Sequence, residues 1–118
     1  MGASFKDLVV WQRAVQLSTA IYSLTAQFPP SEQFGLINQM RRASVSIASN
    51  IAEGYGRTTK GEYLQFLGHA RGSNCELQTQ LIISNELGFG AKKAHESVES
   101  LSADVSRMLI ALMNRLRR

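Results

Sequence analysis

The sequence predicts an all-α fold: an up-down antiparallel four-helix bundle formed by a single domain over residues 1–118. In four long segments, apolar residues recur with the 3.6-residue period of an α-helix, and no segment alternates as a strand would. The only two prolines, Pro29 and Pro30, lie between the first and second segments. Short connections between long helices make neighbouring helices antiparallel, which gives the up-down arrangement.

The first two expected helices are separated by these prolines. Asp7 can cap the first helix, which runs to about residue 27 because a proline cannot continue a helix. The second helix runs from about residue 35 to residue 53. Gly54 and Gly56 supply the permissive backbone that ends it.

The last two expected helices follow a short turn. Thr59 and Glu62 have the spacing of a capping box for a third helix, which runs to residue 87 with Gly88 past its end. The fourth helix occupies about residues 91–116, and its apolar side chains form one stripe, as expected for a helix that packs on a core. That stripe contains Ala94, Val98, Leu101, Val105, Met108, Leu112 and Leu116.

Composition limits the class of protein. Hydrophobic residues make up 44% and charged residues 19%, as in an ordinary globular protein. Thirteen Lys and Arg against nine Asp and Glu give a net charge of +4, which favours acidic partners. Cys75 is the only cysteine, so an internal disulfide is excluded and we expect a reducing, cytoplasmic location. No long apolar run suggests a membrane span or a signal peptide.

No motif for catalysis, metal binding or cofactor binding is found. No acidic residue has a histidine three residues later, as a di-metal site in a bundle needs, and His69 and His95 are expected at the surface or its boundary. Cys75 is followed by Glu76, which argues against an activated thiolate. Asn74 lies within an apolar stripe, where we expect a buried amide that fixes helix register. We therefore expect no enzyme activity, no metal and no cofactor.

The first expected helix carries apolar stripes on nearly opposite sides. They contain Leu8, Trp11, Val15 and Tyr22 on one side, and Val10, Ala14, Leu17, Ile21, Leu24 and Phe28 on the other. A peripheral helix of a monomeric bundle needs one apolar face, and a second exposed face would be a large adhesive patch. Either both stripes belong to a wide core contact in a crowded bundle, or one of them is a subunit interface.

The outer face of the second expected helix favours an interface. Between Met40 and Glu53 there is no lysine, and Glu53 is the only acid. Small side chains in this stretch allow another backbone to come close, whereas a face open to water usually carries long charged side chains. We predict a closed homo-oligomeric ring, because a ring satisfies a head-to-tail interface without an unpaired edge. The expected interface residues are Val10, Leu17, Ile21, Leu24, Ser46 and Ser49.

Basic residues gather in the second and third expected helices, in their connection and at the C-terminus. Beside a glycine-containing turn and a helix N-terminus, such residues can hold phosphate groups, so we predict a nucleic-acid-binding surface. The alternative is an ordinary solvated surface with salt bridges. The candidate contacts are Arg41, Arg42, Arg57, Lys60, Arg71, Arg115, Arg117 and Arg118.

Three segments in order resemble a known family. They are FKDLVVWQRA (5–14), FGLINQMRRASVSIASNIAEGYGR (34–57) and ARGSNCELQTQL (70–81). These segments are similar to the signatures of the bacterial four-helix bundle proteins first recognised in intervening sequences of 23S ribosomal RNA genes. The resemblance covers nearly the whole chain. Relatives of that family include the accessory subunits of diversity-generating retroelements, which form pentameric barrels and bind nucleic acid and a reverse transcriptase.

The resemblance implies a homopentamer without established enzymatic activity, with nucleic acid and a protein such as a reverse transcriptase as candidate partners. No catalytic motif belongs to the family, and only Arg41, Arg42, Arg57 and Arg71 match its recurrent basic positions. Two functions therefore stay open. One is a non-catalytic, oligomeric nucleic-acid-binding protein, and the other is a protein-interaction scaffold whose arginines serve oligomer assembly.

Overall fold

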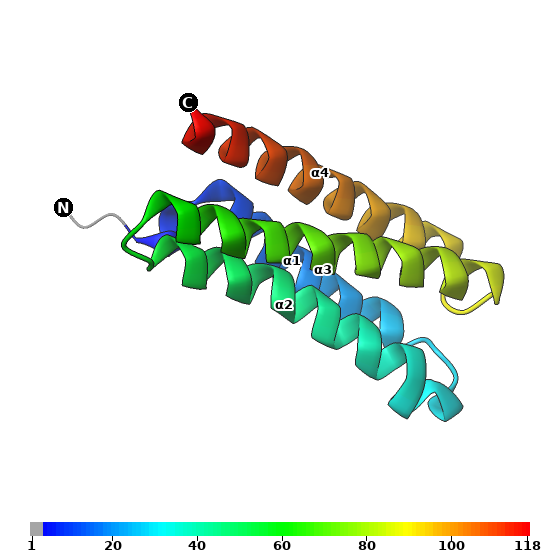
Figure 1. The fold of residues 1–118 in the computed structure, drawn as a ribbon. Coiled ribbons are helices and arrows are strands. Elements are labelled where there is room, and N and C mark those ends of the chain that lie inside the picture. The colour runs from blue at the N-terminus through cyan, green and yellow to red at the C-terminus, as the bar shows by residue number, and fades with distance from the viewer. Residues whose placement is uncertain (1–3) are drawn as a thin grey trace.

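The computed structural model describes residues 4–118, which fold into a bundle of four long helices (Figure 1). The long helices are α1 (Val9–Thr25), α2 (Asn38–Tyr55), α3 (Lys60–Glu86) and α4 (Lys92–Arg117). Short helical turns lie at η1 (Phe5–Asp7), η2 (Pro30–Glu32) and η3 (Gln33–Ile37). Residues 4–118 contain no strand, so the predicted all-α four-helix bundle is confirmed.

Each helix packs against the next one in the chain, and α4 closes the bundle against α1. α1 begins, α2 joins α3, and α4 ends at one end of the bundle (Figure 1). At the opposite end, the α1–α2 and α3–α4 connections meet, and Gln27 Oε1 accepts a hydrogen bond from the Ala91 N–H at 2.8 Å. We call this second end the closed end.

The start of the chain differs from the prediction. Ser4, not Asp7, is the cap: its hydroxyl accepts from the Lys6 N–H at 3.2 Å, and Asp7 accepts from the Ser4 N–H at 3.1 Å. This capping box begins η1, and α1 then starts at Val9 without a side-chain cap. The prediction failed because an acidic residue is favoured both at the cap itself and at the third residue after it. Asp7 occupies the second of these positions.

The end of α2 agrees with the prediction in part. α2 ends at Tyr55 rather than at residue 53, and Gly56 is its C-cap with a right-handed φ of −78°, whereas Gly54 lies inside the helix. A Cβ placed on Gly54 would lie 2.8 Å from the Cβ of Phe66 in α3. Glycine at position 54 therefore allows α2 and α3 to approach closely.

The boundaries of α3 and α4 agree closely with the prediction. Thr59 caps α3 by accepting from the Glu62 N–H at 3.1 Å, and its hydroxyl donates to the Glu62 carboxylate at 3.1 Å. Gly88 follows the end of α3 with a left-handed φ of +76°. The local signals were sufficient because each acts within one helical turn.

A buried polar pair lies in the core between α3 and α4. Asn74 is 2% exposed, and its Nδ2 donates to the Ser102 carbonyl at 3.0 Å. The Ser102 hydroxyl donates to Asn74 Oδ1 at 2.7 Å. The expectation of a buried, hydrogen-bonded amide at position 74 is confirmed.

Only one apolar stripe of α1 faces the core. The side chains of Val10, Leu17, Ile21 and Leu24 are at most 5% exposed, because α2 and α4 cover this face within a single chain. The prediction that these four residues form a subunit interface is therefore wrong. The opposite stripe is partly covered: Leu8 and Trp11 pack against the edge of the core, and Tyr22 is 45% exposed. No helix among residues 4–118 is long and apolar enough to span a membrane.

Candidate nucleic-acid interface

The predicted phosphate contacts fall at separate places on the bundle. Arg41 and Arg42 lie in the first turns of α2, toward the closed end, and Arg71 is exposed in the middle of α3. The remaining contacts gather where α2 joins α3 and α4 ends. We call this region the basic end and define it by Arg57, Lys60, Arg115, Arg117 and Arg118.

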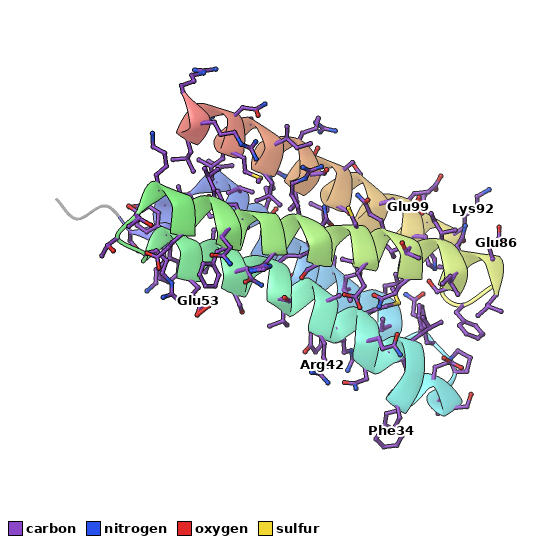
Figure 2. All side chains as sticks on the ribbon, in the orientation of Figure 1. Phe34, Arg42, Glu53, Glu86, Lys92 and Glu99 are labelled. Carbon is purple, nitrogen blue, oxygen red and sulfur yellow. The ribbon has the colours of Figure 1, made fainter. Side chains whose placement is uncertain are left out.

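Charge is distributed unequally between the two ends. Figure 2 shows Glu86, Lys92 and Glu99 toward the closed end, so charges of both signs are mixed there. At the basic end, one salt bridge is formed, between Arg57 Nη2 and Glu53 Oε1 at 3.6 Å. Within residues 4–118, Lys60 and Arg115 have no carboxylate within salt-bridge distance. Their charge is therefore available to an anion.

Arg57 lies over an aromatic ring. Its guanidinium carbon lies 4.5 Å from the centroid of the Phe66 ring. The Arg57 side chain is 40% exposed. His69, which is exposed as predicted, meets the edge of Phe66 at 5.8 Å and 82°. The Arg57 side chain therefore places a positive charge over an aromatic ring at an exposed position.

Two tyrosines lie beside this group. The rings of Tyr55 and Tyr63 meet edge to face at 6.1 Å. Burial raises the pKa of Tyr63 above its ordinary value, and Tyr55 adds to the increase, whereas the Arg115 charge lowers it. Arg115, near the end of α4, is thus close enough to act electrostatically on the first turn of α3.

Arg41 has a structural role. Its guanidinium carbon lies 4.5 Å above the Tyr22 ring, its Nε donates to Thr25 Oγ1 at 2.9 Å, and its Nη2 donates to the Tyr22 carbonyl at 3.4 Å. These contacts tie the start of α2 to the end of α1. Arg41 therefore has fewer N–H groups free for a phosphate than the sequence suggested.

Arg42 is exposed on the outer side of α2 (Figure 2). It lines a shallow polar groove between α2 and α3 together with Ser46, Ser73 and Glu76. Ser46 Oγ lies 2.9 Å from Ser73 Oγ. Ser46, a predicted interface residue, therefore makes a close contact with α3 within one chain.

An apolar groove runs between α1 and α2. It has a volume of about 300 Å³ and is lined on α1 by Trp11 and Val15, and on α2 by Val45, Ala48 and Ser49. Val45 is 44% exposed. Ser49, a predicted interface residue, is exposed in this groove. The partly covered stripe of α1 and the small residues of α2 thus form one continuous surface, which we call the α1–α2 face.

The second histidine is placed differently from the prediction. His95 is 1% exposed, its Nε2 donates to the Phe89 carbonyl at 2.7 Å, and its ring stacks on Phe28 at 6.4 Å. The expectation of a surface position is wrong for this residue, because two connections distant in sequence enclose it. The described part of the chain has no group of three or more His, Cys, Asp or Glu residues suited to a metal ion.

The aromatic partners of the arginines were not predicted from the sequence. Tyr22 belongs to an apolar stripe of the first expected helix, yet its ring carries the Arg41 guanidinium, and the Phe66 ring carries that of Arg57. No sequence spacing reveals these pairs, because each joins two different elements. The signal that could have been used is the turn after Gly54, since a close helix–helix approach brings Arg57 over α3.

Comparisons with known proteins agree with this fold. The family described as 23S rRNA-intervening sequence protein matches residues 6–111. The chain is similar to the 1.70 Å crystal structure of a protein of unknown function from the S23 ribosomal protein family of Bacteroides thetaiotaomicron VPI-5482. That likeness has a TM-score of 0.84 at 21% identity and covers 92% of this chain and 98% of the other. At this identity the likeness shows the fold alone.

A search of curated proteins gave no match. The family match nevertheless extends over most of the sequence, and it begins in η1 and ends in α4. All the predicted basic contacts except Arg115, Arg117 and Arg118 lie within the matched residues. The chain therefore belongs to the 23S rRNA-intervening sequence protein family.

Proposed function

We propose that the protein is a non-catalytic homo-oligomer that binds nucleic acid through its basic end. The observation that supports this proposal most strongly is the concentration of exposed Lys60, Arg115, Arg117 and Arg118 at one end of the bundle, beside Arg57. Lysine and arginine bind phosphates, and the release of counterions from the nucleic acid supplies much of the affinity. Such binding needs no catalytic group.

The oligomer is supported by the α1–α2 face. Trp11, Val15, Val45 and Ala48 form an apolar surface outside the core, and a surface of this kind is typical of an interaction site. We propose that it packs against a neighbouring subunit in a closed ring, a pentamer as the family resemblance implies. Each subunit would contribute a net charge of +4, so a modest basic end would become a strong collective field.

The binding proposal is tested by removing charge at one end or the other. Lys60→Ala with Arg115→Ala should weaken binding to a mixed-sequence duplex and reduce the slope of log affinity against log salt by about 0.9 per lost phosphate contact. Lys92→Ala with Lys93→Ala removes the same charge from the closed end and is the control. Fluorescence anisotropy over a range of salt concentrations measures both quantities. Equal effects of the two pairs would contradict the proposal.

The ring is tested by the mass of the assembly in solution. Sedimentation of the wild type should give a mass several times that of the 13.0 kDa chain. Val45→Glu places a charge on the α1–α2 face and should lower this mass. Leu87→Glu, at a residue that is 57% exposed at the closed end, should leave it unchanged. A wild-type monomer at micromolar concentration would refute the ring.

The alternative is a protein-interaction scaffold in which the arginines stabilise the assembly. The contacts of Arg41 with Tyr22 and Thr25 favour this alternative for that residue. If the ring forms but binds neither RNA nor DNA at low salt, the scaffold is the better description. A protein partner, such as the reverse transcriptase that the resemblance implies, would then be sought.

A further inference from the structure

We infer that the ligand of the basic end is single-stranded nucleic acid, one unpaired base of which stacks on the guanidinium of Arg57. This inference rests on the proposed function and gives it a substrate class. The guanidinium carbon of Arg57 lies 4.5 Å from the centroid of the Phe66 ring. The Arg57 side chain is still 40% exposed, so part of it can be reached by a ligand.

Contacts on several sides hold the guanidinium in this position. The Arg57 N–H donates to the Gly54 carbonyl at 3.0 Å, which fixes the backbone of the turn. Glu53 Oε1 lies 3.6 Å from Nη2 and positions the edge of the plane. Phe66 begins its side chain close to α2, since a Cβ placed on Gly54 would lie 2.8 Å from the Phe66 Cβ. A planar group that is already oriented loses less entropy when a ligand stacks on it.

The surroundings of Arg57 suit an unpaired base. Bases outside a duplex stack on aromatic side chains and on guanidinium planes, and cation–π attraction strengthens the contact. The exposed His69 meets Phe66 edge to face and adds a second aromatic ring beside the site. Lys60, which follows in the first turn of α3, supplies charge for the neighbouring phosphates. In an unbroken duplex, neighbouring bases cover both faces of each internal base. A duplex can therefore contact this site only through its phosphates.

A comparison of the two arginine–aromatic pairs places the stacked base at Arg57 rather than at Arg41. Arg41 also lies 4.5 Å from the centroid of a ring, that of Tyr22. Its guanidinium, however, donates to Thr25 and to the Tyr22 carbonyl, and the residue is half-buried. Arg57 makes no such hydrogen bond from its guanidinium to the described residues and is exposed.

The test compares Arg57→Lys with the wild type, because this change keeps the charge and removes the plane. Affinity for oligouridylate and oligothymidylate should fall about tenfold, as expected for the loss of one stacked base. The salt slope and the affinity for a duplex of equal length should stay unchanged. Arg71→Lys makes the same exchange at an exposed residue of α3 and should alter none of these quantities.

Fluorescence of a strand that contains 2-aminopurine reports stacking directly. Quenching should accompany binding to the wild type and weaken with Arg57→Lys, and Phe66→Leu should give the same result if circular dichroism shows a folded protein. If single strands and duplex bind alike, and Arg57→Lys changes neither affinity nor quenching, the stacking inference is overturned while the proposed function stands. If the folded wild type binds no nucleic acid at all, both are overturned.

Discussion

At the closed end of the bundle, Phe28 is 5% exposed and packs on Phe89 at 5.6 Å and on His95 at 6.4 Å. At the basic end, Phe66 is half-buried and carries the guanidinium of Arg57 on its ring. Aromatic residues therefore exclude water at one end and orient a cation at the other. An aromatic ring thus contributes to stability where other rings cover it, and to recognition where an exposed cation covers it.

The connections explain why the two ends differ. At the closed end, Gly90 adopts a left-handed φ of +80°, and a Cβ there would lie 2.8 Å from Leu24 Cδ1. The α3–α4 connection can thus fold down onto α1 and cover the rings. At the basic end, the turn between α2 and α3 is short, and Arg57 in this turn lies next to α3. We therefore expect the largest losses of stability from substitutions at the closed end, and changes in binding from substitutions of the exposed cations at the basic end.

The largest expected effect is the loss of stability when the closed end is opened. Phe28→Ala should lower the free energy of unfolding by about 3–5 kcal/mol, because it removes a buried ring and leaves a cavity. Phe34→Ala is the matched control: Phe34 belongs to the same connection but is 89% exposed, and the change should cost no more than about 0.5 kcal/mol. Urea unfolding measures both, and similar losses would show that the closed end is not sealed by Phe28.

A smaller effect is expected from the close approach at the basic end. Gly54→Ala places a Cβ against Phe66 and should cost about 1–3 kcal/mol through overpacking. Gly72→Ala, in α3 where nothing lies within 4 Å of the new Cβ, should instead stabilise the protein by about 0.5–1 kcal/mol. Thermal unfolding measures the two changes. A gain in stability for both variants would disprove the tight contact.

The smallest effect concerns Tyr63 and appears only at high pH. Burial raises the pKa of Tyr63 above its ordinary value of 10.0, so the folded chain holds the phenol proton more tightly than the unfolded chain does. The resulting stabilisation is complete below pH 10.0 and is lost as pH rises through the raised pKa. Tyr63→Phe should flatten this decline in the unfolding free energy. Tyr22→Phe, at an exposed ring, should keep it.

The sequence predicted those features that short-range signals determine. Thr59 with Glu62, and Gly88 after α3, act within one helical turn, so the helices and their order could be expected in advance. Burial of Asn74 also followed from helical periodicity, which fixes which side chains share a face. The α4 stripe was predicted in part: Val98, Val105 and Leu112 are buried, but the core also takes Leu109 and Met113, because the buried face is turned relative to the predicted one.

Features that depend on tertiary contacts could not be predicted in the same way. Both stripes of α1 are apolar, and periodicity does not indicate which of them α2 and α4 cover, so Leu17 and Ile21 were assigned to the wrong side. His95 lies under Phe28, and Arg57 lies over Phe66, only after separate elements have packed together. The basic residues of the basic end could be predicted from the sequence. The position of Arg57 over Phe66 could not, because it depends on how the helices pack.

The hydrogen bonds between Asn74 and Ser102 have a mechanical consequence. Sliding α4 past α3 by one helical turn would move Ser102 about 5.4 Å along the axis and leave a buried amide and a buried hydroxyl without partners. The pair therefore opposes sliding of the two longest helices past each other and holds them in one register.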